Sequence, residues 1–133
     1  MSVSINELFN VAGKIAVVTG GSRGIGRMIA EAYVENGVKT YITARKEKAC
    51  QQTASELSQR GECVALPADL STSDGRAQFV SEIKAREKKL DILVNNAGAA
   101  WGAPYAEYPE DGYDKVMDIN VKAIFMLTRD LLP

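Results

Sequence analysis

Apolar residues are concentrated in four short runs, which cover residues 15–18, 38–43, 63–66 and 90–94. The first run, Ile-Ala-Val-Val, is continuous and rich in β-branched residues. This pattern is typical of a strand that is buried on both faces of a parallel sheet. We therefore predict a strand in each run, and Pro67 is expected to end the third.

The segments between these runs carry apolar residues at helical spacing. In the first segment, one helical face is predicted to hold Ile25, Met28, Ile29, Ala32 and Tyr33. Gly37 follows, at a position where helices often end in a left-handed residue. In the second segment, the side chains predicted to point inward are Ala49, Cys50, Ala54 and Leu57. Gly61 is expected to end that second helix.

Two further helices are predicted in the second half of the chain. Residues 71–74, Ser-Thr-Ser-Asp, match the capping-box pattern that opens a helix, and the apolar residues among 79–83 give this helix a buried face. The last helix is expected to begin near Pro109 and to run to Leu132.

Strands that alternate with helices of this length imply right-handed crossovers and a parallel sheet with helices on both faces. We predict an α/β protein with a Rossmann-type doubly wound parallel sheet of strand order 3-2-1-4. A ligand cleft is expected between strands 1 and 4, where the direction of winding reverses. At 133 residues the chain is long enough to bury a core, and residues 1–133 are assigned to one domain.

Composition narrows the possible functions. The formal net charge is -1, and no apolar run is long enough to span a bilayer, so we expect neither a nucleic-acid nor a membrane partner. Residues 1–7 lack the features of a signal peptide, and a cytoplasmic location is expected. Because the chain has no histidine, Ser-His-Asp and Cys-His mechanisms are excluded within it, and no metal site is expected. Cys50 and Cys63 are interpreted as buried, reduced thiols.

A glycine-rich segment with G-x-x-x-G-x-G spacing follows the first predicted strand and opens the first helix. At such a place a pyrophosphate meets free backbone N–H groups and the positive end of the helix dipole. Glycine is needed because a side chain would hold the backbone away from the phosphates. The alternative is an ordinary tight turn. The predicted cofactor-binding residues of this segment are Gly20, Ser22, Arg23, Gly24, Ile25 and Gly26.

About twenty residues further on, NAD-binding folds usually place an acid that binds the ribose hydroxyls. This chain has Thr43-Ala44-Arg45-Lys46 there instead. Arg45 can pair with a 2′-phosphate through its planar fork of donors, and Arg23 could approach the same phosphate from the other side. The alternative, that Arg45 and Lys46 are solvated charges at a helix start, is less favourable because cations are poorly placed at a helix N-terminus. The expected cofactor is therefore NADP(H).

Polar residues also follow the third and fourth predicted strands. Asp69 could accept a hydrogen bond from an adenine amino group, and Leu70 follows it. Asn96 and Gly98, with Ala97 between them, could line a ribose. Taken singly, Asp69 could be only a turn residue and Asn96 only part of a strand terminator.

In combination, these motifs resemble the short-chain dehydrogenase/reductase family along the whole chain. The resemblance rests on Thr19-Gly-x-x-x-Gly-Ile-Gly26, then Asp69, then Asn95-Asn-Ala-Gly98. Two closer features, residues 95–102 and 42–45, look like the NADPH-dependent 3-oxoacyl-[acyl-carrier-protein] reductases, with the rhamnolipid-associated subgroup nearest. The resemblance implies carbonyl reduction by hydride transfer from NADPH, with a 3-oxoacyl thioester as substrate and a homotetrameric parent enzyme.

The resemblance also marks Asn120 as a catalytic residue, because Met117-Asp-Ile-Asn-Val121 matches the segment that carries the family's active-site asparagine. In the family this asparagine positions water for a proton relay. Independently, Asn120 lies within an apolar helical stripe formed by Tyr113, Val116, Met117, Ile124, Leu127 and Leu131. An unpaired carboxamide there would cost about 1–3 kcal/mol, so a purely structural hydrogen bond is the alternative role.

The family's catalytic tyrosine and lysine form a Tyr-x-x-x-Lys motif, and this motif does not occur in the chain. The resemblance implies that this pair and the catalytic serine lie beyond Pro133, that the remainder of the catalytic domain is absent, and that residues 1–133 alone are inactive. Sugar or small-ketone reduction remains an alternative activity. A non-catalytic NADP(H)-binding module remains an alternative from a different functional class.

Overall fold

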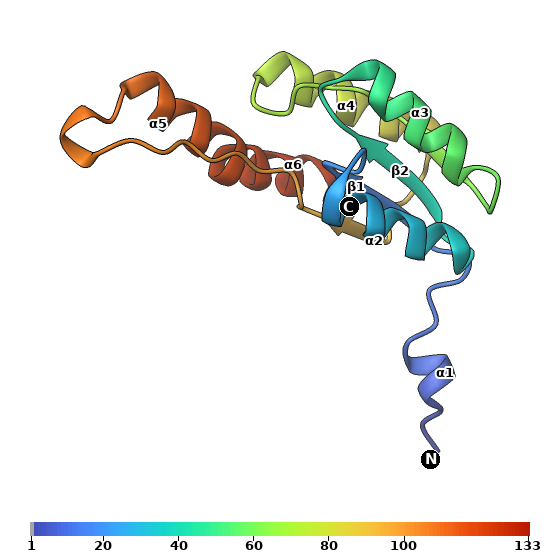
Figure 1. Cartoon of the computed structure of the whole chain (residues 1–133). Helices are drawn as coiled ribbons and strands as arrows, with labels where there is room; N and C mark the ends of the chain where they lie inside the picture. The colour runs from blue at the N-terminus through green and yellow to red at the C-terminus, as the bar shows by residue number, and fades with distance from the viewer. Residues whose placement is uncertain (1) are drawn as a thin grey trace.

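A computed structural model describes residues 2–133 of the chain (Figure 1). Its centre is a parallel sheet of four strands in the order β3-β2-β1-β4. The strands are β1 (Ile15–Thr19), β2 (Lys39–Thr43), β3 (Cys63–Ala65) and β4 (Ile92–Val94). Every neighbouring pair is parallel, and Val17 of β1 lies opposite Tyr41 of β2 and Leu93 of β4. The predicted doubly wound α/β fold and its strand order are confirmed.

Helices cover both faces of this sheet. One core cluster joins the sheet to α2 (Gly24–Glu35) and α3 (Glu47–Leu57). The other joins it to α4 (Ser73–Arg86) and α6 (Ala123–Leu131). Adjacent residues of a strand point to opposite faces, so Val17 packs in the second cluster and Val18 in the first.

The remaining elements lie outside these two layers. Near the N-terminus, α1 (Ile5–Leu8) stands away from the sheet. After β4 come the 3-10 turn η1 (Tyr105–Glu107), α5 (Glu110–Met117) and the π-helical turn η2 (Asp118–Lys122), which continues directly into α6. The predicted last helix is therefore present, but a π-helical turn interrupts it. Its α5 end projects beyond the sheet (Figure 1).

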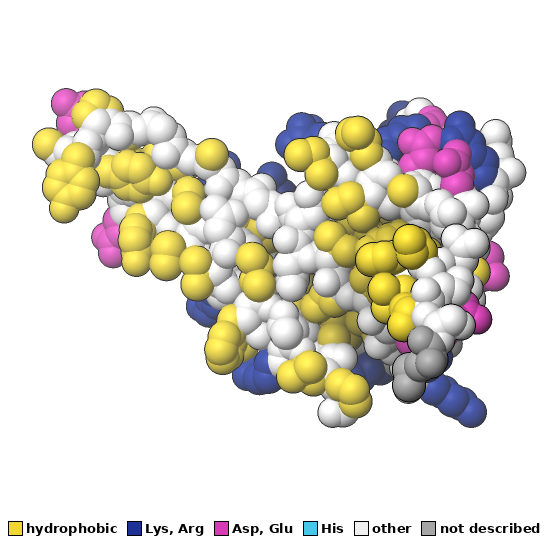
Figure 2. Space-filling model, turned by 90° about the horizontal axis from the view of Figure 1, so that it is seen from below, with side chains coloured by type: hydrophobic (Ala, Val, Ile, Leu, Met, Phe, Trp, Pro, Cys, Tyr) yellow, Lys and Arg dark blue, Asp and Glu magenta, His cyan; other side chains and the backbone are white. Residues whose placement is uncertain are grey.

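Figure 2 shows apolar side chains along this projecting arm. The large apolar residues that are at least half exposed include Tyr105 of η1 and Tyr113 of α5, and further along the chain Val121 of η2 and Phe125 of α6. Tyr113 belongs to the predicted apolar stripe of the last helix, yet its side chain is exposed, because the N-terminal part of α5 extends past the sheet. None of the helices formed within residues 2–133 is both long and apolar enough to cross a membrane.

Two predicted helix faces need correction. On α2, Ile25 and Met28 are 70% and 67% exposed, whereas Gly26, Ala30 and Val34 are buried. Small residues at this spacing let α2 approach the sheet closely, so the larger apolar residues are turned outward. Ala32 of α2 and Ala49 of α3 are exposed as well.

The capping prediction for α4 is displaced by one residue. Thr72, not Ser71, is the N-cap, and its Oγ1 accepts from the backbone N–H of Gly75 at 3.0 Å. The physical reason is that the Ser71 hydroxyl is engaged elsewhere, because it donates to Asp69 Oδ1 at 2.6 Å.

Candidate functional site

A cleft of about 650 Å³ opens at the carboxyl ends of the strands. All of the predicted cofactor-binding residues line it: Gly20, Ser22, Arg23, Gly24, Ile25, Gly26, Arg45, Asp69, Leu70, Asn96, Ala97 and Gly98. Residues far apart in the sequence thus meet at one place. Sequence reasoning did not assign several further lining residues, among them Thr43, Lys115, Asp118 and Ile119. Thr43 could have been assigned to the cleft, because it ends a predicted strand. The other three residues lie on the last helical segment, and the sequence does not reveal that this segment passes beside the cleft.

The glycine loop is shaped by conformation at some positions and by space at others. Gly20 and Gly24 have φ values of 65° and 55°, in the left-handed region that favours glycine. At Gly26, an added Cβ would lie 2.2 Å from the carbonyl oxygen of Gly20 and 2.4 Å from Nδ2 of Asn96. Because α2 begins at Gly24, the free N–H groups of its first turn are presented at this loop.

Asn96 fastens the glycine loop to the end of β4. Its Nδ2 donates to the backbone oxygens of Thr19 at 3.0 Å and Gly20 at 3.3 Å. The Thr19 hydroxyl accepts from the N–H groups of Asn96 and Ala97, both at 2.9 Å, and donates to the oxygen of Val94 at 3.2 Å. The side-chain amide of Asn96 is therefore used to brace the cleft, and its contact with a ribose stays a prediction.

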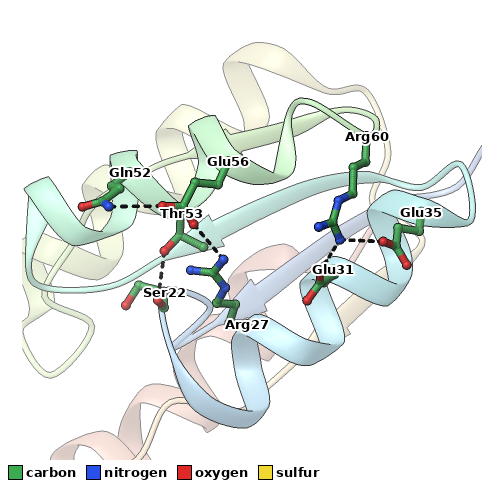
Figure 3. Close-up of polar contacts among 8 residues, drawn as sticks. All are labelled: Ser22, Arg27, Glu31, Glu35, Gln52, Thr53, Glu56 and Arg60. Atoms are coloured by element: carbon green, nitrogen blue, oxygen red, sulfur yellow. Dashed lines mark hydrogen bonds and ion pairs between the residues drawn. The ribbon is translucent and has the colours of Figure 1, made fainter.

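Two arginines stand at the cleft without an anionic partner. Arg23 and Arg45 are exposed and line the cleft, and neither forms an ion pair with any residue in the described range. Nearby arginines behave differently (Figure 3). Arg27 of α2 pairs with Glu56 of α3 at 2.7 Å, and its hydrogen bond lowers the pKa of that carboxyl. Arg60 pairs with both Glu31 and Glu35 of α2.

The loop after β3 is held rigidly at the cleft. Asp69 Oδ1 accepts from the backbone N–H of Ser71 at 3.0 Å as well as from its hydroxyl. The buried guanidinium of Arg76 donates to the carbonyl oxygen of Leu70 at 2.9 Å. No hydrogen bond within residues 2–133 uses Oδ2 of Asp69, which leaves an acceptor for an external donor.

Thr43, the last residue of β2, lines the cleft and carries an orphaned hydroxyl. Among the residues that the structure describes, its Oγ1 is the buried side-chain oxygen or nitrogen that lacks a hydrogen-bond partner. The Thr43 backbone is engaged, since its carbonyl oxygen accepts from the N–H of Gly21 at 3.2 Å.

Asn120 lies in the π-helical turn η2 and is not part of the cleft wall. Both ends of its amide contact one residue, because Nδ2 donates to the oxygen of Ala99 at 2.7 Å and Oδ1 accepts from the Ala99 N–H at 3.0 Å. This pair of bonds fixes the loop after β4. A structural role is thus visible, and the catalytic role of Asn120 stays a prediction. π-Helical turns occur frequently at functional sites.

Both cysteines are free and buried, as predicted, and burial raises the pKa of each thiol to about 11. Neither is poised as a thiolate nucleophile at neutral pH. In the described part of the chain, no three His, Cys, Asp or Glu side chains gather in a group that could hold a metal ion.

A doubly wound parallel sheet, a glycine turn at the start of α2 and a cleft at the strand ends define a nucleotide-binding protein of the Rossmann type. Residues 14–133 match the family model described as short chain dehydrogenase, and the chain belongs to that family.

Among curated proteins, the chain is 49% identical over 129 residues to the rhamnolipids biosynthesis 3-oxoacyl-[acyl-carrier-protein] reductase of Pseudomonas aeruginosa. The match covers 97% of this chain and 50% of the relative, so the chain spans about half the length of that protein.

Solved structures agree with this relationship. The Pseudomonas aeruginosa RhlG/NADP active-site complex matches with a TM-score of 0.89 and 49% identity, over 94% of this chain and 49% of that one. L-Sorbose reductase from Gluconobacter frateurii, complexed with NADPH and L-sorbose, matches with a TM-score of 0.88 and 29% identity, over 92% and 47%.

Proposed function

We propose that this chain is the NADP(H)-binding part of an oxidoreductase that reduces a carbonyl group by hydride transfer. The observation that carries the proposal is the convergence of all the predicted cofactor-binding residues on one cleft, with the unpaired Arg23 and Arg45 at its wall. A cation pair without an internal anion is suited to a phosphate. Relatives of known structure that bind NADP or NADPH support this assignment.

Each part of the cleft has a proposed role. The glycine loop and the first turn of α2 bind the pyrophosphate through backbone N–H groups. Arg45 and Arg23 hold the 2′-phosphate. Asp69 accepts from the adenine amino group through its unused oxygen, and Leu70 lies beside the base. Asn96, Ala97 and Gly98 line the ribose. The bound cofactor supplies the hydride, while these residues fix where it lies.

Residues 1–133 are proposed to be the amino-terminal portion of one catalytic domain, whose remainder carries the acid and the substrate loop. The half-length match to the Pseudomonas reductase and the absence of a Tyr-x-x-x-Lys motif from this sequence support this arrangement. A homotetramer is the proposed assembly, and the exposed Val121 and Phe125 support an interface along the last helix.

The proposed substrate is a 3-oxoacyl thioester, which is supported by the 49% identity to a 3-oxoacyl-[acyl-carrier-protein] reductase. Reduction of a sugar or a small ketone is the second candidate, favoured by the likeness to L-sorbose reductase. If the complete protein lacked a Tyr-x-x-x-Lys motif, a non-catalytic NADP(H)-binding module would be the better assignment.

Binding by the 133-residue chain itself tests the cofactor assignment. Adenosine 2′,5′-bisphosphate carries the adenosine and both phosphates that the cleft is proposed to hold, but no nicotinamide. We expect saturable binding by calorimetry, about tenfold or more tighter than that of 5′-AMP, because one charge-assisted phosphate contact contributes about 1.5 kcal/mol or more. Equal affinity for the two ligands would contradict the assignment to NADP(H).

A further inference from the structure

Among the residues that the structure describes, the buried threonine hydroxyls are hydrogen bonded, with the exception of Thr43. Thr19 donates to Val94, Thr40 to Val38 and Thr53 to Ser22, each through a backbone oxygen. Thr43 is fully buried, and its hydroxyl has no partner within the described residues. Leaving a buried hydroxyl unpaired is unfavourable, and such a group in a folded protein requires an explanation.

The orphaned hydroxyl is placed at the proposed nucleotide site. Side chains two residues apart on a strand face the same side of a sheet, and Tyr41 packs in the cluster that contains Leu70. Thr43 therefore faces the side of the sheet on which the loop of Asp69 and Leu70 closes the cleft. It also lies two residues before Arg45, and all four of these cleft residues, Thr43, Arg45, Asp69 and Leu70, line the same space.

We propose that the Thr43 hydroxyl forms a hydrogen bond with the adenosine part of the bound dinucleotide, between the 2′-phosphate at Arg45 and the base at Asp69. This inference rests on the proposed function. A hydroxyl both donates and accepts, so it can pair with a ribose hydroxyl or with a ring nitrogen. Because Thr43 is fully buried in the free chain, the groups that cover its hydroxyl must shift when the ligand binds.

A packing role alone does not account for the hydroxyl. Valine has the same shape as threonine, favours strands equally and would leave no unpaired polar atom at this position. The hydroxyl therefore destabilises the free chain and strengthens the complex. Thr43→Val should therefore raise the stability of the free chain and lower its affinity for the ligand. If the hydroxyl instead made a structural hydrogen bond, the same substitution would lower the stability of the free chain.

Thr40→Val is a matched control. It is the same substitution in the same strand, but the Thr40 hydroxyl is satisfied by Val38 at 3.1 Å, and Thr40 does not line the cleft. Thr40→Val should lower the melting temperature and leave ligand affinity unchanged. Thr43→Ser, which keeps the hydroxyl, should bind within about twofold of the unmodified chain.

The experiment uses the 133-residue chain and adenosine 2′,5′-bisphosphate, with affinity from calorimetry and melting temperature from circular dichroism. For Thr43→Val we expect affinity to fall about three- to tenfold, the range of one net hydrogen bond, with a melting temperature equal to or above that of the unmodified chain. Unchanged affinity in Thr43→Val, or a lowered melting temperature, would overturn the proposed role of Thr43 and leave the proposed function standing. Absence of binding by the unmodified chain would overturn the proposed function and this inference together.

Discussion

Arg45→Asp reverses the charge at one wall of the cleft without breaking an ion pair of the folded chain. Arg45 is exposed, lines the cleft and has no carboxylate partner within the described residues. We therefore expect the melting temperature to change little, since substitutions at such surface positions are usually within about 0.5 kcal/mol. The consequence should be confined to the ligand that carries a 2′-phosphate.

The size of the effect follows from the kind of contact that is lost. A charge-assisted hydrogen bond to phosphate contributes about 1.5–3 kcal/mol, so NADPH affinity should fall about tenfold to a hundredfold. NADH has no 2′-phosphate, and an aspartate can accept from its ribose hydroxyls, so its affinity should be unchanged or improved. Because Arg45 is exposed, the preference for NADPH should also narrow as salt is raised.

Fluorescence titrations with NADPH and NADH measure both affinities, in the complete protein and in the 133-residue chain. Lys88→Asp is a matched control, because it makes the same change of charge at an exposed residue on the amino-terminal side of β4, away from the cleft. It should shift both affinities little. If the unmodified protein binds the two cofactors equally, or if Arg45→Asp weakens both alike, the assignment of Arg45 to the 2′-phosphate is wrong.

Three further outcomes are expected. In the complete protein, if it has the proposed reductase activity, Asn120→Ala should abolish most turnover while cofactor affinity barely moves. Normal turnover with a lowered melting temperature would contradict a catalytic role. It would show that Asn120 acts only through its two hydrogen bonds to Ala99. The 133-residue chain should bind NADPH measurably but more weakly than the complete protein does. It should not oxidise NADPH with an acetoacetyl thioester, since lost placement of the reactants removes about 7–11 kcal/mol of barrier lowering. Oxidation at the rate of the complete protein would refute the assignment of the acid to the remainder of the domain. Glu87 accepts from Tyr41 and pairs with Lys39, and chiefly the Lys39 hydrogen bond lowers its pKa below the ordinary 4.5. Glu87 therefore contributes stability above that pH and loses it as pH falls through the lowered pKa, so Glu87→Gln should melt lower at neutral pH, and this difference should disappear in acid. A constant difference across the pH range would exclude this account.

The sheet could be predicted from the sequence because its central strands are covered on both faces. A short, continuous and β-branched apolar run such as residues 15–18 favours a strand that is buried on both faces. The glycine loop and Arg45 were also predictable, since their chemistry depends on residue type and on position relative to a strand. The residues of the glycine loop and Arg45 line the same cleft, as predicted.

The sequence did not predict which face of each helix is buried, nor which hydrogen bonds the cleft residues form with one another. Helical periodicity gives weight to large apolar residues, so it selected Ile25 and Met28, although Gly26 and Ala30 are the residues of α2 that are buried. Likewise, Asn96 was assigned to a ribose, because sequence does not reveal that its amide already bonds two backbone oxygens. The π-helical turn around Asn120 has no periodic signal at all.

The Thr19 hydroxyl, which joins the end of β4 to the glycine loop through three backbone groups, has a consequence for the kinetics of binding. The two halves of the cleft are already locked together in the free chain, so an incoming nucleotide has little backbone to order. We expect association to be fast and similar among variants of the cleft. Differences in affinity should then reside in how long the nucleotide stays bound.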